Sequence, residues 1–479
     1  MNQMTTWELF TEKAKKQGYS VYESSKAEAD GVLYAMVRSN TEKKLAVGGE
    51  VAGFTGTVAD GIMYCDLTVD NAKALMDVFP FTRPVSHKGH KLTVGLGDRL
   101  GVATPGLIRA VAEYDAFPVL AQQSIRELTL TGRTFPGVIA DACFGVFQEG
   151  YRGGYGADGD HLKTREEIKY AIDSGCSMIT LDCSAHIRDK VDVESTYITL
   201  PQERRAYYEQ NYLDQELPFV GRLTLDEVKR IAVVFDGAIT HAIDCYGYIQ
   251  SLTEREVDFE LSIDEAMSIT LPAEHYVIAN ELKKQGITPV SVAPHFTGEF
   301  EKGIDYQGNL AQYVRDLQIH QEIAEYFGYK LSLHSGSDKL SVYPMTGKIT
   351  GCDLHVKTAG TNWLEALRVL AQKDPALYRR AHKFALEHWA EATRYYHVTT
   401  DPKTIADIDY LSDACLPDLL NKDASRQLMH ITYGLLLAEP WFRTPLYRLL
   451  HEEEEMFYAG LVCHIGRHMR YLTKPVFTK

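Results

Sequence analysis

The chain has few of the features that direct a protein to nucleic acids, membranes or an oxidising compartment. Its 479 residues carry 65 acidic and 50 basic side chains, for a net charge of -15, and this excess disfavours nonspecific binding to nucleic acids or anionic membranes. The 8 cysteines form no C-x-x-C pair, which indicates reduced thiols. No apolar run approaches the ~20 residues of a membrane span, and residues 1–9 lack a signal-peptide pattern. We therefore expect a cytoplasmic protein without nucleic-acid or membrane partners.

A nucleotide cofactor is also disfavoured. Gly95, Gly97 and Gly101 resemble the glycines of a dinucleotide-binding turn, but no acidic partner or βαβ context accompanies them.

What the chain does contain, from Lys91 onward, is a series of short apolar runs separated by helical patterns. This alternation is typical of βα units around a parallel sheet, and eight runs predict an α/β protein with a closed (β/α)₈ TIM barrel. The predicted strands are 92–96, 117–121, 155–160, 178–182, 257–261, 290–295, 330–334 and 353–357.

The barrel is expected to occupy residues 86–360, with an insertion at about 185–255 near the active site, because roughly 75 residues separate the fourth and fifth runs. Helices of this insertion are predicted at 203–211 and 225–250. Residues 1–85 predict a small α/β extension, with helices at 6–18 and 69–79 and strands at 32–37 and 44–47.

Residues 361–479 predict a helical C-terminal region. Its segments are expected at 364–373, 376–396, 424–437 and 445–471. The acidic run 452–455 is typical of a solvated helix face. His464 and His468 have the i, i+4 spacing of a helical metal pair, but we favour an exposed helix surface for them.

Three of the predicted strands end in a histidine. Asp160 and His161 are adjacent at the end of the Gly-rich third run, and His295 and His334 end the sixth and seventh runs. Three imidazoles delivered by three strand ends match a catalytic divalent-metal site with positions left open for substrate. Zn, Ni, Co, Mn and Fe all suit imidazole ligands, so the metal itself stays open.

The order of several short motifs resembles that of the class II, metal-dependent ketose-bisphosphate aldolases. Nearly the whole chain, including both ends and residues 334–339, is still more similar to the tagaturonate epimerase family. The motifs are residues 117–124, 159–161, 177–184, 259–261, 293–295 and 333–337.

This resemblance implies roles for the acidic and histidine side chains. Asp160 would be the proton acceptor, and His161, His295 and His334 would bind the metal. Glu265 falls where the aldolases carry a proton donor.

Three further carboxylates have open roles. Asp264 is a rival to Glu265 as proton donor. Glu260 is expected to support a metal-binding histidine rather than to act as a fourth ligand. Asp182 is either an active-site carboxylate at the fourth strand end or the cap of a turn.

The substrate end departs from the aldolase pattern, because a keto-uronate presents a carboxylate and hydroxyl groups instead of phosphates. Residues 335–339 offer small residues for an anion-binding turn together with the ammonium of Lys339. The other candidates for substrate contacts are Gln122, Ser124, Arg126 and Lys357. We expect Lys339 to contribute before Arg126, although each is also compatible with a structural ion pair.

The resemblance implies an isomerase that interconverts D-tagaturonate and D-fructuronate in hexuronate catabolism. These sugars differ at the carbon β to the keto group, which deprotonation next to the carbonyl cannot invert. A retro-aldol route can do so, by cleaving the bond to the α carbon, rotating the aldehyde fragment and rejoining it. A class II ketose aldolase and a noncatalytic aldolase-accessory subunit remain alternatives, and a homo-oligomer is left open.

Overall fold

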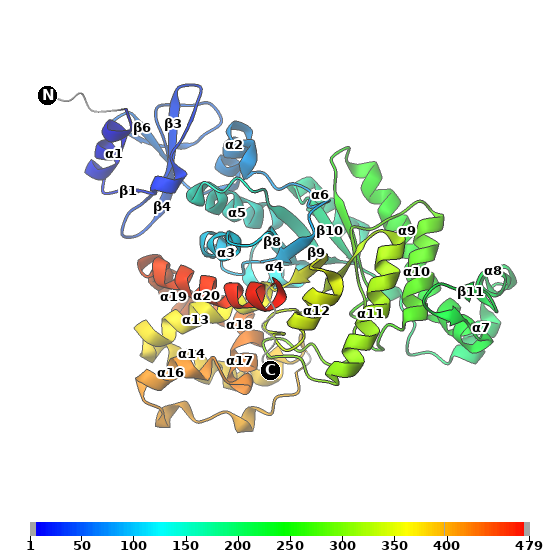
Figure 1. Cartoon of the computed structure of the whole chain (residues 1–479). Coiled ribbons are helices and arrows are strands. Elements are labelled where there is room, and N and C mark those ends of the chain that lie inside the picture. Colours follow the sequence, from blue (N-terminus) through cyan, green and yellow to red (C-terminus); the bar gives the residue numbers. More distant parts are fainter. Residues whose placement is uncertain (1–5, 397, 474–479) are drawn as a thin grey trace.

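The computed structural model describes residues 6–396 and 398–473. Three parts follow one another along the chain: an N-terminal antiparallel sheet, a closed barrel of parallel strands, and a C-terminal group of helices (Figure 1). None of the described helices combines the length and the apolar character that crossing a membrane requires.

The N-terminal sheet is buried on both faces. In β3 (Val32–Arg38), Tyr34 and Met36 join the main hydrophobic core, whereas Leu33, Ala35 and Val37 join a second, smaller core with Phe10. This division follows from the alternation of side chains along a strand. The other elements of this part are α1 (Thr6–Lys16), β1 (Ser20–Val21), β2 (Ala27–Ala29), β4 (Lys43–Val47), β5 (Gly56–Ala59), β6 (Ile62–Cys65) and α2 (Val69–Val78).

Two Asp-Gly pairs make the tight turns of this sheet. Asp30-Gly31 joins β2 to β3 and Asp60-Gly61 joins β5 to β6, and all four residues have positive φ angles between 51° and 77°. Two consecutive positive φ angles define the turn that matches the twist of a hairpin, and Asp-Gly is a favoured sequence for it.

All eight predicted barrel strands are present, including the Gly-rich third one. They close into a barrel in the order β10-β13-β14-β15-β16-β7-β8-β9, and every pairing between them is parallel. The (β/α)₈ prediction is confirmed. The strands are β7 (Leu92–Gly95), β8 (Phe117–Ser124), β9 (Gly156–Leu162), β10 (Met178–Asp182), β13 (Asp258–Ser262), β14 (Ser291–Ala293), β15 (Lys330–Leu333) and β16 (Leu354–Lys357).

Helices surround this barrel, and several begin with the reciprocal hydrogen bonds of a capping box. Ser124, Thr164 and Thr224 cap α4, α6 and α9, each with a glutamate three residues later. The surrounding helices are α3 (Thr104–Val111), α4 (Ile125–Thr131), α5 (Phe135–Glu149), α6 (Arg165–Ser174), α9 (Leu225–Leu252), α10 (Pro272–Lys284), α11 (Leu310–Phe327) and α12 (Tyr343–Thr350).

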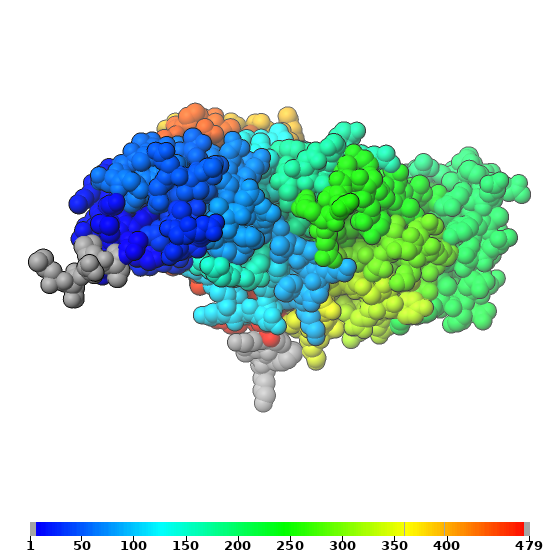
Figure 2. Space-filling model, turned by 90° about the horizontal axis from the view of Figure 1, so that it is seen from above, coloured from blue at the N-terminus to red at the C-terminus, as the bar shows by residue number. Residues whose placement is uncertain are grey.

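The insertion between the fourth and fifth barrel strands projects from the side of the barrel. It lies at the opposite end of the molecule from the N-terminal sheet, as two perpendicular views show (Figures 1 and 2). Before α9 it contains α7 (Val193–Thr199), α8 (Gln202–Tyr212), β11 (Glu216–Leu217) and β12 (Gly221–Arg222).

The C-terminal region is helical, as predicted, but three of the expected helices are broken, and the first of them, 376–396, divides at His388. The segment 424–437 divides at Thr432, and 445–471 begins earlier and divides at Glu453. The helices are α13 (Asn362–Lys373), α14 (Pro375–Glu387), α15 (Trp389–Ala392), α16 (Leu416–Leu419), α17 (Asp423–Ile431), α18 (Tyr433–Ala438), α19 (Pro440–Glu452) and α20 (Glu454–Thr473).

The expectation of a solvated face at 452–455 is wrong for Glu454. This side chain is buried and pairs with Lys43 at 2.6 Å and with Arg38, while Tyr22 donates a hydrogen bond to it at 2.8 Å. The partners lie more than 400 residues away along the chain, so no local pattern could reveal them. Glu454 therefore joins the C-terminal helices to the N-terminal sheet.

Candidate active site

Polar side chains gather at the C-terminal ends of the barrel strands, around two adjoining cavities. The two cavities share Arg126, Glu265, Lys302, His334, Ser335 and Tyr396. The first also contains Asp264 and His295, and the second contains Asp160, His161 and Lys357. The expectation that the insertion lies near the site is not met for these two cavities, because none of the residues 185–255 lines either of them.

A β-bulge places both Asp160 and His161 in the second cavity. Between Ile179 and Leu181 of β10, the paired strand β9 advances from Gly159 to Leu162, which gives it one extra residue. His161 takes a left-handed backbone with φ 52°. Because a bulge interrupts the alternation of side chains, neighbouring residues can face the same space.

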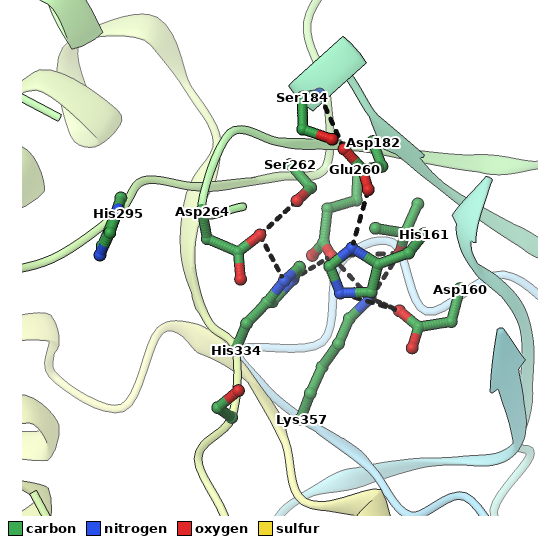
Figure 3. Close-up of polar contacts among 12 residues, drawn as sticks. Asp160, His161, Asp182, Ser184, Glu260, Ser262, Asp264, His295, His334 and Lys357 are labelled. Atoms are coloured by element: carbon green, nitrogen blue, oxygen red, sulfur yellow. Dashed lines mark hydrogen bonds and ion pairs between the residues drawn. The ribbon is translucent and has the colours of Figure 1, made fainter. Parts of the chain in front are cut away.

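Three side chains approach one another closely enough to hold a metal ion. Ligand atoms of His161, Asp264 and His334 all lie within 4.8 Å of one another (Figure 3). The Nδ1 atoms of both histidines are buried and lack a hydrogen-bond partner among the described residues, and His334 Nδ1 lies 3.1 Å from Asp264 Oδ1. Two imidazoles and a carboxylate are suitable ligands for Zn, Ni, Co, Mn or Fe, so these residues fit the expected cation.

Glu260 contacts the ring nitrogen of His334 that does not face Asp264. Its Oε1 atom lies 2.8 Å from His334 Nε2 and its Oε2 accepts a hydrogen bond from Ser291 at 2.5 Å. A carboxylate that accepts one ring N–H of a histidine fixes the ring and leaves the other nitrogen for a metal. This is the supporting contact that was expected for Glu260.

Lys357 is held at the centre of the barrel by carboxylates. Its ammonium lies 3.0 Å from Asp158, 2.6 Å from Asp160 and 2.9 Å from Glu260, and it donates to Thr180 at 2.5 Å. Burial by itself would lower the pKa of Lys357, but these three carboxylates hold it well above its usual range. Lys357 is thus a permanent cation whose charge is already matched.

The same ammonium keeps Asp160 ionised. Burial alone would raise the pKa of Asp160, but Lys357, with the imidazoles of His161 and His334, lowers it to about 2. Asp160 contacts Lys357 and His161 through Oδ1, and in Figure 3 its second carboxylate oxygen points away from them. One oxygen is therefore anchored and the other is available to a ligand.

Asp264 and Glu265 differ in surroundings although they are adjacent. Asp264 turns inward, accepts a hydrogen bond from Ser262 and faces His334. Burial alone would raise the pKa of Asp264, but His334 holds it well below its usual range. Glu265 is exposed and lines both cavities. This arrangement suits Asp264 as a metal ligand, and leaves Glu265 as the proposed proton donor.

His295 lies apart from the three clustered ligands (Figure 3). Its Nδ1 contacts the backbone carbonyl of Ala266 at 2.8 Å, which is the arrangement that leaves Nε2 free to act as a ligand. The structure thus brings together two of the three predicted histidines and replaces the third with Asp264. His295 remains a proposed additional ligand.

Asp182 caps a turn, and it also contacts Lys163 and His161, so its active-site role stays a prediction. Its Oδ1 accepts the N–H of Ser184 at 2.8 Å, which is a turn cap, while Oδ2 lies 3.1 Å from Lys163 and 3.8 Å from His161 Nδ1. Burial alone would raise the pKa of Asp182, but the contact with His161 holds it well below its usual range.

The predicted substrate contacts divide into two groups. Gln122, Ser124, Arg126 and Lys357 line the second cavity. Lys339 lines neither cavity, because it is fully buried and donates to the carbonyl groups of Glu301, Ile304 and Ser337 at 2.6–3.1 Å. We therefore leave Lys339 out of the proposed substrate contacts.

The cavities contain residues that the sequence did not single out. Lys302 comes from the loop after β14, Tyr396 follows α15, and His430 belongs to α17. No motif marks any of them, and all three depend on the packing of chain segments far apart in sequence.

The expectation of an exposed surface for His464 and His468 is wrong. Both are buried and, with Asp338, form a second group of closely spaced ligand atoms. His468 Nε2, however, accepts the backbone N–H of Asp338 at 2.7 Å, and Nδ1 faces the carbonyl of His464 at 2.7 Å. Asp338 also pairs with Arg426 at 2.5 Å. With its nitrogens engaged, His468 instead ties α20 to the loop that follows His334.

A closed parallel barrel with polar residues at its C-terminal strand ends is the architecture of a TIM-barrel enzyme. The model of the tagaturonate epimerase family matches residues 22–472. The tagaturonate/fructuronate epimerase of Thermotoga maritima is 38% identical over 473 residues, which cover 95% of this chain and 97% of that protein.

Crystal structures of the fructuronate-tagaturonate epimerase of Cohnella laeviribosi superpose closely. The native form and a glycerol complex both have a TM-score of 0.94 and 44% identity, and they cover 97% of this chain and 98–99% of theirs. The chain belongs to the tagaturonate epimerase family. It is therefore an isomerase, and the noncatalytic alternative is wrong.

Proposed function

We propose that the protein interconverts D-tagaturonate and D-fructuronate by a metal-dependent retro-aldol reaction, as a step of hexuronate catabolism. The observation that carries this proposal is the cluster of His161, His334 and Asp264 directly beside Asp160. A divalent cation held by the cluster would polarise the keto group of the substrate and stabilise the negative charge that develops on the keto fragment.

Asp160 supplies the base in this proposal. Its oxygen that does not face Lys357 accepts the proton of the hydroxyl group on the carbon to be inverted. The C–O bond of that carbon becomes a carbonyl, its bond to the α carbon breaks, and the electron pair moves to the keto fragment. Lys357 stays protonated and keeps Asp160 in position.

Inversion requires that the aldehyde fragment rotates before the bond re-forms. The new alkoxide then lies on the other face of the carbon, where a second acid must supply its proton. Glu265 serves this role in the proposal, because it lines the same cavity as Asp160 and its side chain is exposed. The reaction is balanced, since one proton is removed and one returned and no oxidant is required.

The test is product analysis by NMR after incubation of the purified protein, loaded with a divalent metal, with D-tagaturonate. Formation of D-fructuronate supports the proposal. Accumulation of free three-carbon products without epimer would indicate the aldolase alternative, and full activity after exhaustive chelation would contradict the metal dependence.

A further inference from the structure

The charges around the second cavity are unevenly distributed. The carboxylate of Asp160 lies beside His161, and Asp264, which lines the adjoining first cavity, completes the histidine cluster. The cavity is also lined by three cations, Arg99 and Lys302 from the loops after β7 and β14 and Arg126 from α4, together with Glu127 and Glu265. A ligand with a polarisable carbonyl at one end and a negative charge at the other would match this arrangement.

Among the described residues, two cations of this group, Arg126 and Lys302, have no carboxylate oxygen within 4 Å, and the less exposed of the two is Lys302. Its ammonium donates a hydrogen bond to Ser335 Oγ at 2.7 Å. Within residues 6–396 and 398–473, no carboxylate oxygen lies within 4 Å of it. By contrast, Arg99 is paired with Glu127 at 2.9 Å. Burial lowers the pKa of Lys302, as expected for a cation that gives up hydration without gaining a partner.

His430 is the second unsatisfied group. It is buried, it lines the same cavity as Lys302, and neither ring nitrogen has a hydrogen-bond partner among the described residues. Its position depends on Gly360, where a Cβ atom would lie 2.5 Å from His430 Cε1. Burial, with the cations Arg99, Lys302 and Arg426, holds the pKa of His430 well below its usual range. The ring is neutral, so one nitrogen can donate a hydrogen bond to a ligand.

We propose that Lys302 and His430 form the subsite for the carboxylate of the substrate. This inference rests on the proposed function, which supplies an anionic keto-uronate. Lys302 provides the charge, and His430 provides a directed N–H. Ser335, next to His334, holds the ammonium near the metal-binding cluster. Arg126 lines both cavities and is exposed, so we assign it to the outer edge of this subsite.

The assignment explains how one fragment can be retained while it rotates. In a retro-aldol cleavage of tagaturonate, the carboxylate stays on the aldehyde fragment, two carbons from the carbon that is inverted. A fixed carboxylate leaves rotation about the intervening C–C bond free, so the aldehyde can present its other face without leaving the cavity. The neutral counterpart of the substrate, D-tagatose, has a hydroxymethyl group at this position and would lack that anchor.

The test compares these two ligands by isothermal titration calorimetry on the full-length, metal-loaded protein. An Asp160→Asn background removes the proposed base and keeps each ligand intact during the titration. In Lys302→Met, the preference for D-tagaturonate over D-tagatose should fall by about 10- to 100-fold, the loss expected for a hydrogen bond to a charged group. His430→Phe should lower it by about 3- to 10-fold. Affinity for D-tagatose should change by less than about threefold in both.

Lys283→Met, at the exposed end of α10, is the matched control and should leave both affinities unchanged. Thermal unfolding of each variant separates a lost contact from a lost fold, and Lys302→Arg should retain most of the preference. An unchanged preference in Lys302→Met, or a loss confined to Arg126→Met, would overturn the subsite. Absence of epimerisation by the wild-type protein would refute the proposed function alone, because the calorimetric comparison does not depend on turnover.

Discussion

Metal binding should release a proton from His334. Burial alone would lower the pKa of this imidazole, but Asp264 and Glu260 raise it to about 10 in the metal-free protein. A histidine must be neutral to bind a metal. Because this pKa lies about three units above pH 7, the imidazole is almost fully protonated at pH 7, and the cation has to displace its proton.

The magnitude follows from this difference. Competition with the proton should reduce the apparent affinity for the metal at pH 7 about 10³-fold relative to a pH above 10. Below pH 10, this affinity should increase about tenfold for each unit by which the pH is raised. The sign is fixed, because a raised pKa means that the protonated form dominates at every pH below about 10. The effect should be measurable between pH 6 and 8 with Co²⁺ as the probe.

Calorimetry in buffers of different ionisation enthalpy counts the protons released. Wild-type protein should release at least one proton per Co²⁺ at pH 7. Asp264→Asn removes a ligand together with the charge that holds the proton, so both the affinity and the number of released protons should fall. His295→Ala, which alters a residue outside the cluster, should retain the proton release and lose less affinity. A pH-independent affinity, or a larger loss in His295→Ala than in Asp264→Asn, would refute this reasoning.

Three further outcomes are expected. Asp160→Asn should bind Co²⁺ but epimerise at least about 100-fold more slowly; normal turnover would place the base elsewhere, with Asp182 the next candidate. Substrate deuterated at the inverted carbon should keep its label without a primary isotope effect, and washout into solvent would contradict bond cleavage. Burial lowers the pKa of His87, His320, His382 and His464 to about 3–4, so below about pH 6.5 the unfolded chain takes up protons that the folded chain does not. As the pH is lowered, the free energy of unfolding should then fall by up to about 1.4 kcal/mol per pH unit for each histidine. A urea concentration at half-unfolding that stays constant from pH 7 to 5 would rule this out.

The barrel could be predicted because its signal is local. Each parallel strand is buried on both faces and appears as a short apolar run, and even the Gly-rich run 155–160 is a strand. The ends of these runs also located His161 and His334, since strand ends meet at one face of a barrel. Asp264 lies just beyond such an end, and only the direction of its side chain distinguishes it from Glu265.

The remaining residues could not be assigned because their surroundings come from distant segments. Lys302 and Lys339 are both lysines in polar loops, yet one faces the cavity and the other is enclosed by three backbone carbonyls. His430 and His464 lie on predicted helices, but the helical pattern did not reveal the neighbours that these two side chains meet, and for His464 it wrongly favoured exposure. A sequence supplies the periodicity of a helix, whereas the partner of each face depends on the packing of the whole chain.

The left-handed backbone of His161 has a consequence for how such a protein tolerates change. A residue with a side chain is strained at φ 52°, and Ser335, beside His334, has φ 50°. Glycine would relieve this strain at either position. Selection for heat resistance alone would therefore favour replacing His161, and an enzyme evolved in that way would gain stability while losing one of the proposed metal ligands.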